Sequence, residues 1–280
     1  MEVLETRKTL QEYLLHLRQK QLRIAFVPTM GALHQGHIAL IRHAHTVADI
    51  VVCSIFVNPT QFNDPEDLKK YPRPIEADIR KLREAGCHVL FHPAVTEMYG
   101  PNEQWHLDLG DLDKILEARH RPGHFQGVTQ IVKKLFDIVQ PDVACFGQKD
   151  FQQVKVIELM IARFGLPVQL SVVPTVRESD GLAMSSRNVR LSPTGRQQAL
   201  ALYTALQQIK AGLAYKTPTE LQRGAQLYLE ASPGVTVEYV AICDAQHLTP
   251  ITGFSSAQQA VALVAAWVDG VRLIDNMLLT

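Results

Sequence analysis

Fully apolar runs that alternate with amphipathic stretches are the feature of this 280-residue sequence that most constrains its fold. Uniformly apolar strands are typical of parallel sheets that are buried on both faces. The first part of the chain therefore predicts an α/β fold with a Rossmann-like, doubly wound parallel sheet. The predicted strands are residues 23–27, 50–57, 88–91, 142–146 and 167–173, and the predicted helices are residues 36–49, 75–85, 127–139 and 151–164.

After Val176 the alternation of apolar runs and amphipathic stretches gives way to a polar segment, which predicts a second domain. Residues 177–188 are polar and turn-rich, and we expect them to form a flexible linker that helps a lid to close. The sequence thus predicts a larger domain over residues 1–176 and a smaller α+β lid domain over residues 177–280. The smaller domain has predicted helices at residues 193–211 and 217–230, predicted strands at residues 235–242, 259–268 and 271–279, and a hairpin turn at Asp269-Gly270.

The composition argues against two classes of partner. Lys plus Arg and Asp plus Glu number 28 each, so the formal net charge is zero and the basic excess of a nucleic-acid binder is missing. The longest apolar run, residues 260–268, is shorter than the roughly 20 residues that span a bilayer. The charged N-terminus is unlike a secretory signal, and the four cysteines stand alone in apolar runs as buried thiols do. We expect a cytoplasmic protein with no nucleic-acid or membrane partner.

The segment after the first predicted strand has the features of a phosphate-binding loop. It reads Pro28-Thr-Met-Gly-Ala-Leu-His-Gln-Gly-His37 and enters a predicted helix, whose N-terminal amides attract anions. A Walker loop is excluded because His37 occupies the position of its lysine. His34 and His37 lie on one helical face, where imidazolium N–H groups would stabilise a reacting phosphoryl group. Capping or exposed histidines, and a zinc pair that lacks a third ligand, are the alternatives.

Three further segments carry polar side chains at strand ends or at the domain junction. Asn58 and Gln61 follow the second strand, where an ordinary Asn-Pro turn is the alternative. Lys149, after the fourth predicted strand, offers a point charge to a phosphate, or else is a solvated surface charge. The segment Met184-Ser-Ser-Arg-Asn188 has two hydroxyls and a guanidinium suited to phosphate, or else is a plain linker.

Together these motifs resemble one family. His34-Gln-Gly-His37 matches the His-x-Gly-His motif of the nucleotidyltransferase superfamily, and the whole loop from Pro28 resembles the pantothenate synthetase (pantoate–β-alanine ligase) family. The other segments are similar to the family's Asn-Pro-x-Gln-Phe, Phe-Gly-x-Lys-Asp and Met-Ser-Ser-Arg-Asn strings, in the same order along essentially the whole chain. Residues 183–187 depart from the Lys-Met-Ser-Lys-Ser loop of tRNA synthetases at both lysines, which argues against that relative.

The resemblance implies an activity. Members of the family condense pantoate with β-alanine at the expense of ATP, through a pantoyl-adenylate, and form pantothenate, AMP and pyrophosphate. It also implies Mg²⁺ as the ion on the phosphates and a homodimer. Two alternatives stay open: an adenylyltransferase acting on a small phosphate ester, and a regulatory module that binds ATP.

The resemblance also implies roles for individual residues. Residues 1–176 are expected to form the nucleotide- and pantoate-binding domain. His34, His37 and Lys149 are expected to be the catalytic residues. Arg121 and His124 are expected against the active site, and Asp78 beside Mg²⁺, whose other protein ligands are unknown. The ATP-binding residues implied are Met30, Gly31, His34, Gly36, His37, Gly147, Gln148, Lys149, Asp150, Val176, Met184, Ser185, Ser186 and Arg187. Those implied for pantoate are Asn58, Gln61 and Gln153, with Gln61 also bordering β-alanine.

Overall fold

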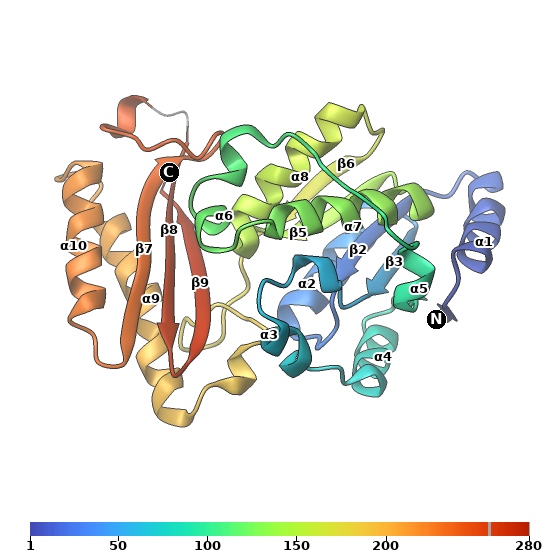
Figure 1. Cartoon of the computed structure of the whole chain (residues 1–280), viewed down its shortest axis with the longest axis horizontal. Helices are drawn as coiled ribbons and strands as arrows, with labels where there is room; N and C mark the ends of the chain where they lie inside the picture. The colour runs from blue at the N-terminus through green and yellow to red at the C-terminus, as the bar shows by residue number, and fades with distance from the viewer. Residues whose placement is uncertain (257–258, 280) are drawn as a thin grey trace. The chain divides into compact units, whose positions relative to one another are not determined.

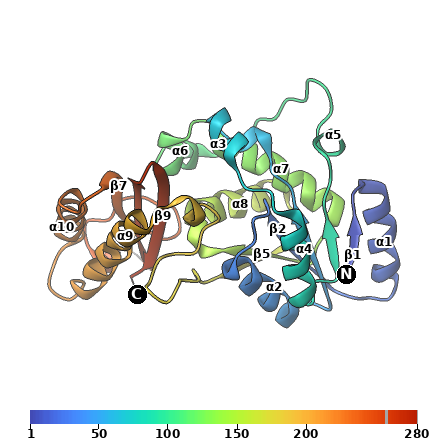
Figure 2. The ribbon, with the colours of Figure 1, turned by 90° about the horizontal axis from the view of Figure 1, so that it is seen from below.

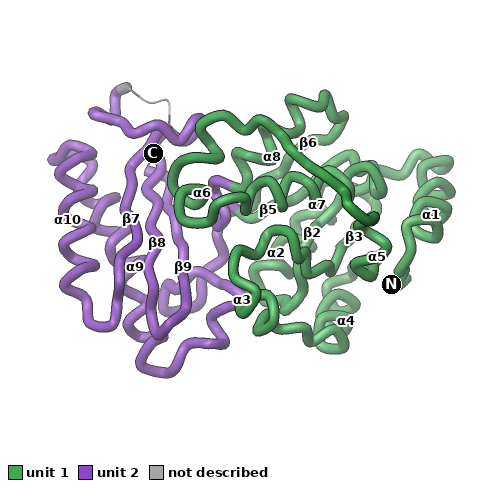
Figure 3. The backbone as a smooth tube through the Cα atoms, viewed as in Figure 1, with its two compact units in different colours: residues 1–147, 153–174 green, residues 148–152, 175–280 purple. Residues whose placement is uncertain are grey.

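A computed structural model describes residues 1–256 and 259–279 of the chain. The chain divides into two compact units (Figure 3). Unit 1 contains residues 1–147 and 153–174, and unit 2 contains residues 148–152 and 175–280. The larger boundary lies two residues before the predicted one, and the segment 148–152 belongs to unit 2, which the sequence did not predict.

Unit 1 is built on a parallel sheet, as predicted, with helices on both faces (Figures 1 and 2). The strands lie in the order β1-β4-β3-β2-β5-β6, all within the described residues 1–174. They are β1 (Glu2–Leu4), β2 (Ile24–Thr29), β3 (Ile50–Ile55), β4 (Val89–Phe91), β5 (Val143–Gly147) and β6 (Gln169–Val173). The longer helices are α1 (Arg7–Gln19), α2 (Gln35–Val47), α4 (Ile75–Glu84), α7 (His124–Val139) and α8 (Phe151–Phe164). Short ones are η1 (Pro59–Gln61), α3 (Pro65–Lys70), α5 (Val95–Met98), η2 (Gly110–Asp113), α6 (Glu117–His120) and η3 (Gln148–Asp150).

Successive residues of the central strand β2 point into two different cores. Ile24 and Phe26 pack with apolar residues of α1, α7 and α8 in one core, and Ala25 and Val27 pack with residues of α2 and α4 in the other. Because side chains alternate across a strand, a strand buried on both faces must be apolar throughout. This is the physical reason why the fully apolar runs predict the sheet correctly.

The order of the strands places a topological switch point at β2. The chain leaves β2 through α2 to pair with β3 on one side, and it later returns to pair β5 with the other side of β2. Open α/β sheets bind ligands in the crevice beyond the carboxyl ends of the strands at such a point. The topology therefore predicts that a ligand binds next to the residues that follow β2 and those that end β5.

Unit 2 has an antiparallel sheet in the order β7-β8-β9, which confirms the predicted α+β character. Apolar side chains of α9 and α10 pack on one face of this sheet. The turn between β8 and β9 has Asp269 at φ 53° and Gly270 at φ 68°, as a two-residue hairpin requires. The elements are η4 (Asn188–Arg190), α9 (Pro193–Ala211), α10 (Pro218–Glu230), β7 (Val235–Asp244), η5 (Phe254–Ser256), β8 (Ala260–Val268) and β9 (Val271–Leu278).

Two parts of the fold differ from the sequence prediction. Strand β1 and helix α1 were not predicted, although Leu10 and Leu14 of α1 are fully buried and Thr6 caps the helix. Strand β6 was predicted to be buried, but it forms an edge of the sheet and its residues are mostly exposed or half-buried. An edge strand has a neighbouring strand on one side only. Its other side is open to solvent, so the residues of an edge strand can be polar and exposed. No helix in the described part of the chain is long and apolar enough to cross a membrane.

We expect the four cysteines of the native protein to be almost inert to thiol reagents. All four are buried and free, as the sequence predicted. Burial raises the pKa of the Cys87 and Cys145 thiols to about 11 and that of Cys243 to about 12, and it raises the pKa of Cys53 as well. Below these values the thiols carry their protons, and the thiolate is the reactive form. Labelling with a chromogenic disulfide at mildly alkaline pH should be slow in the native protein and should reach four thiols per chain in guanidinium chloride. Rapid labelling of the native protein would contradict this burial.

Candidate functional site

The loop between β2 and α2 is held by a buried carboxylate from α4. Asp78, only 1% exposed, accepts hydrogen bonds from the backbone amides of Ala32 (2.7 Å) and Leu33 (2.8 Å). Gly31 and Ala32 both have positive φ angles, 81° and 50°, and a Cβ at Gly31 would lie 3.0 Å from a methyl carbon of Ile55. This turn aims two successive amides at one carboxylate, which offsets the cost of the strained backbone at Ala32.

The amides of the loop and the carboxylate of Asp78 have partners within the protein. The amides of Ala32 and Leu33 serve Asp78, and that of Gly31 donates to Thr29 Oγ1 at 3.1 Å, so the loop uses these amides internally. Both oxygens of Asp78 accept backbone N–H groups, and the expectation that Asp78 lies beside Mg²⁺ stays a prediction. The structure gives Asp78 the task of shaping the loop.

His34 and His37 form a reciprocal cap at the start of α2. The Nδ1 of His34 accepts from the amide of Gly36 at 3.1 Å, and the Nδ1 of His37 accepts from the amide of His34 at 3.3 Å. An N–H donor requires an unprotonated acceptor, so each ring carries its proton on Nε2. The ring centroids lie 4.1 Å apart, and both side chains are half-buried. The capping alternative is therefore correct as local structure, and the cap also fixes the tautomer of both rings.

This tautomer changes the chemistry predicted for the pair. The sequence pattern predicts imidazolium donors, whereas protonation of either Nδ1 would break the hydrogen bond that this atom accepts. While these two hydrogen bonds are made, each ring is a neutral imidazole that carries its proton on Nε2. Such donors suit the stabilisation of negative charge without a proton transfer.

Asn58 is the centre of a buried polar network beyond β3. Its Nδ2 donates to Gln61 Oε1 (3.0 Å) and to the carbonyl of Gly127 (3.1 Å). Its Oδ1 accepts from Tyr99 (2.6 Å) and Thr60 (3.1 Å). Both donors and both lone pairs of the amide are thus used, and Asn58 is only 1% exposed. Asn58 holds Gln61 in this network, and its contact with pantoate stays a prediction.

Close packing against α7 makes this network possible. A Cβ at Gly127 would lie 2.4 Å from the carbonyl oxygen of Thr60, so only glycine allows α7 to approach η1 here. Burial raises the pKa of Tyr99 to about 12, which keeps its hydroxyl protonated as the donor to Asn58.

Gln61 links this network to the first loop. Its Nε2 donates to Met30 Sδ at 3.1 Å, and its backbone carbonyl accepts from the Nδ1 of the buried His124 at 2.8 Å. Gln61 is 9% exposed. Arg121, which was expected against the active site, pairs with Glu117 at 3.9 Å. Unit 1 thus brings Met30 and Gln61 together and fixes Gln61 through both its side chain and its backbone.

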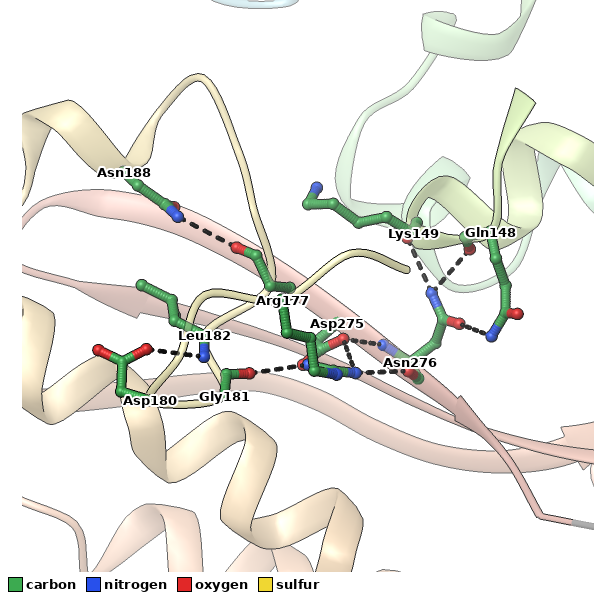
Figure 4. Close-up of polar contacts among 10 residues, drawn as sticks. Gln148, Lys149, Arg177, Asp180, Gly181, Leu182, Asn188, Asp275 and Asn276 are labelled. Carbon is green, nitrogen blue, oxygen red and sulfur yellow. Dashed lines mark hydrogen bonds and ion pairs between the residues drawn. The ribbon is translucent and has the colours of Figure 1, made fainter. Parts of the chain in front are cut away.

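In unit 2, the turn after β5 is held by a side chain that is distant in the sequence. Asn276 on β9 donates to the carbonyls of Gln148 (3.0 Å) and Lys149 (2.8 Å), and it accepts from Gln148 Nε2 at 3.1 Å (Figure 4). The ammonium of Lys149 lies 3.8 Å from Asp150. These hydrogen bonds tie Gln148 and Lys149 to β9, in agreement with the division that assigns residues 148–152 to unit 2.

The segment that starts at Arg177 is anchored where the sequence predicted a flexible linker. Arg177 makes a two-pronged ion pair with Asp275, with N–O distances of 2.6 and 2.9 Å (Figure 4). Its guanidinium also lies 4.1 Å from the ring centre of Tyr203. Arg196 makes a second bidentate pair with Glu178 at 2.9 and 3.1 Å. Charged pairs of this geometry restrain both partners, so the linker is part of the body of unit 2.

The predicted phosphate-binding residues near the end of this segment have local backbone partners. The carbonyl of Val176 accepts from the amide of Met184 at 3.0 Å, and Ser185 Oγ accepts from the amide of Arg187 at 3.2 Å. Ser186 lies within this turn and is half-buried.

The predicted residues therefore fall into two groups. Unit 1 holds Met30, Gly31, His34, Gly36, His37, Asn58, Gln61, Gly147 and Gln153, and unit 2 holds Gln148, Lys149, Asp150, Val176, Met184, Ser185, Ser186 and Arg187. Their assignment to ATP and pantoate stays a prediction. Among the residues that the structure describes, no group of three or more His, Cys, Asp or Glu side chains is arranged to hold a metal ion. The zinc alternative thus finds no third ligand among the described residues.

Several residues of these networks were not predicted, chiefly Tyr99, Asp275 and Asn276. Asp275 and Asn276 interrupt an otherwise largely apolar strand, and their exposures are only 4% and 2%. Two adjacent polar residues inside an apolar run are a signal that the sequence did contain. A doubly wound α/β unit with a glycine-containing loop and a helix N-terminus at its switch point is of the class that binds a ligand there.

The comparisons with known proteins identify the family within this class. A model of the family "Pantoate-beta-alanine ligase" matches residues 2–278. A pantothenate synthetase of Porphyromonas gingivalis is 46% identical over 277 residues, which cover 99% of each chain, and one of Moorella thermoacetica is 44% identical over 283 residues, which cover 100% of this chain and 99% of the relative. The chain belongs to the pantoate-β-alanine ligase family and is an ATP-dependent ligase.

Solved structures agree with this assignment. The crystal structure of a pantothenate synthetase from Thermus thermophilus matches with a TM-score of 0.93 and 41% identity, covering 99% of both chains. A pantoate-β-alanine ligase from Francisella tularensis, complexed with "Beta-gamma ATP" and β-alanine, matches with a TM-score of 0.81 and 34% identity, covering 99% of this chain and 97% of that one.

We expect the substitution Asp78→Ala to destabilise the protein by about 3 kcal/mol, because two charge-assisted hydrogen bonds are lost and two amides lose their partner. Urea unfolding followed by circular dichroism measures this. Glu84→Ala, at an exposed position on the same helix, should change the free energy of unfolding by no more than about 0.5 kcal/mol. Equal effects of the two substitutions would contradict the role given to Asp78.

Proposed function

We propose that this protein condenses pantoate with β-alanine in an ATP-dependent reaction that passes through a pantoyl-adenylate. The observation that carries the proposal is the pair His34 and His37 at the switch point, both fixed with Nε2–H as the donor. Family membership and the ligands of the Francisella tularensis structure support the choice of substrates.

The first step is attack of a pantoate carboxylate oxygen on the α-phosphorus of ATP. The bond from that phosphorus to the bridging oxygen breaks, and pyrophosphate leaves. Catalysis here consists of in-line positioning and stabilisation of charge. We assign the Nε2–H of His37 to the α-phosphate, with His34 beside it. Lys149, Ser185, Ser186 and Arg187 are assigned to the phosphate chain as a whole.

The second step is attack of the neutral β-alanine amine on the carbonyl carbon of the mixed anhydride. The bond from that carbon to the phosphate oxygen breaks, AMP leaves, and the amine loses one proton. An acyl-adenylate must be kept from water until the amine arrives. Closure of unit 2 as a lid is the means that we propose for this.

The network around Gln61 supports a hydroxyl-bearing acid without a phosphate as the first substrate. It consists of amide, hydroxyl, thioether and imidazole groups from Asn58, Thr60, Tyr99, Met30 and His124. The Nε2 of Gln61 has a second N–H to donate, and Gln61 is the residue that we assign to pantoate and to the β-alanine entry. A phosphate ester, the substrate of the adenylyltransferase alternative, calls for cationic partners.

Mg²⁺ enters this proposal as the ion bound to the phosphates of the nucleotide, and we assign no protein ligand to it. The homodimer and the cytoplasmic location are expectations from the resemblance. Light scattering of the purified protein tests the first of these.

The decisive experiment measures AMP with pantoate, β-alanine and ATP, leaving out each in turn. We expect AMP release to require all three substrates, and exchange of pyrophosphate into ATP to require pantoate but not β-alanine. An adenylyltransferase would retain AMP in its product, and a regulatory ATP-binding module would give neither reaction.

The substitution His37→Ala should lower kcat by about 10²–10³-fold and change ATP affinity far less, because the Nε2–H acts on charge that develops in the transition state. Steady-state kinetics and calorimetric ATP titration separate the two quantities. His16→Ala, at an exposed position of α1, is the matched control and should retain full activity. An enzyme that keeps its speed without His37 would remove this residue from the mechanism.

A further inference from the structure

The side-chain amide of Asn276 forms hydrogen bonds with one short segment, Gln148 and Lys149. Its Nδ2 donates to two consecutive carbonyls, those of Gln148 and Lys149, and its Oδ1 accepts from Gln148 Nε2. The residue is 2% exposed and stands 127 positions from Lys149 in the sequence. A buried side chain that fixes two successive peptide groups determines the path of that backbone.

The neighbouring residue Asp275 does a related task on the opposite face of the same strand. Val271 and Leu273 of β9 pack against the helices of unit 2, and alternation places Asp275 on that face and Asn276 on the other. Asp275 holds Arg177 by the bidentate ion pair, and Arg177 also donates to the backbone carbonyl of Asn276 at 3.3 Å. Two adjacent residues of β9 thus anchor two segments that lie far apart in the sequence (Figure 4).

We propose that Asn276 is a positioning residue for the nucleotide, which acts by fixing the backbone of Gln148 and Lys149. This inference rests on the proposed function, in which Lys149 binds the phosphate chain. Asn276 itself is not proposed to touch ATP. Its effect passes through the main chain that carries the Lys149 ammonium.

The proposal explains the division of the chain. Residues 148–152 are joined by peptide bonds at both ends to unit 1, yet they belong to unit 2. The three hydrogen bonds of the Asn276 side chain tie this segment to β9. Lys149 therefore lies in the same unit as residues 184–187, which include the other residues that we assign to the phosphates.

The test is the substitution Asn276→Asp, which keeps the size of the side chain. It replaces both N–H donors by a carboxylate oxygen that faces two carbonyl oxygens. We expect kcat/KM for ATP to fall by about 10–100-fold, the effect of losing two or three hydrogen bonds that orient a binding group. The KM for β-alanine should stay near its original value.

Two control variants separate positioning from general damage. Asn102→Asp makes the same chemical change on an exposed turn of unit 1 and should retain the ATP kinetics of the unsubstituted enzyme. Leu229→Ala removes a fully buried side chain from the core of unit 2. It should lower the melting temperature at least as much as Asn276→Asp does, and leave KM for ATP unchanged in assays well below that temperature.

A double-substitution cycle with Lys149→Ala tests the route of the effect. ATP affinity is measured by calorimetry without pantoate, so that no turnover is needed. If Asn276 acts through Lys149, Asn276→Asp should change affinity by no more than about twofold once Lys149 is already replaced. Additive losses would overturn the proposal.

The outcome for Asn276 is distinguishable from the outcome for the proposed function. Failure of the function would appear as an unsubstituted protein that forms no AMP from the three substrates. Failure of this inference would appear as an active enzyme in which Asn276→Asp has normal ATP kinetics, or in which Leu229→Ala raises KM for ATP as much as Asn276→Asp does.

Discussion

The carboxylate of Asp78 is the interaction on which the candidate site depends most. It lies on α4, 46 residues beyond Ala32, and it accepts the amides of two successive loop residues from a buried position. Without an acceptor there, these two N–H groups would lose their partner, and the strained turn at Gly31 and Ala32 would have little to hold it. The cap formed by His34 and His37 starts directly after this turn, so the orientation of both rings follows from it.

The two units position their side chains by the same physical means. In unit 1, Asn58 uses its whole amide to hold Gln61 and the segments around it. In unit 2, Asn276 uses its amide to hold the backbone of Gln148 and Lys149. Amide side chains suit this task because they donate and accept at once without carrying a charge into the protein interior. Within each unit, the residues expected to meet the ligands are thus supported by polar side chains that are buried, such as Asn58 and Asn276, or half-buried, such as Tyr99.

Most of the elements could be predicted from the sequence alone. Helices α8 and α9 begin and end at the predicted residues, and the hairpin at Asp269-Gly270 is where the dipeptide indicated it. The exceptions have physical reasons. Helix α1 is polar over most of its surface, so the signal from Leu10 and Leu14 is weak, and β6 lies at the edge of the sheet, where burial on one side is enough.

The sequence by itself determined the alternation of strands and helices, the loop after β2 and the residue types at each strand end, because periodicity and motifs are local properties of the chain. Only the tertiary structure decided which nitrogen of His34 and His37 accepts a hydrogen bond and how the amide of Asn58 uses all of its donors and acceptors. It also decided that residues 148–152 belong to unit 2. Each of these depends on a hydrogen bond whose geometry, or whose partner many residues away, no local pattern encodes.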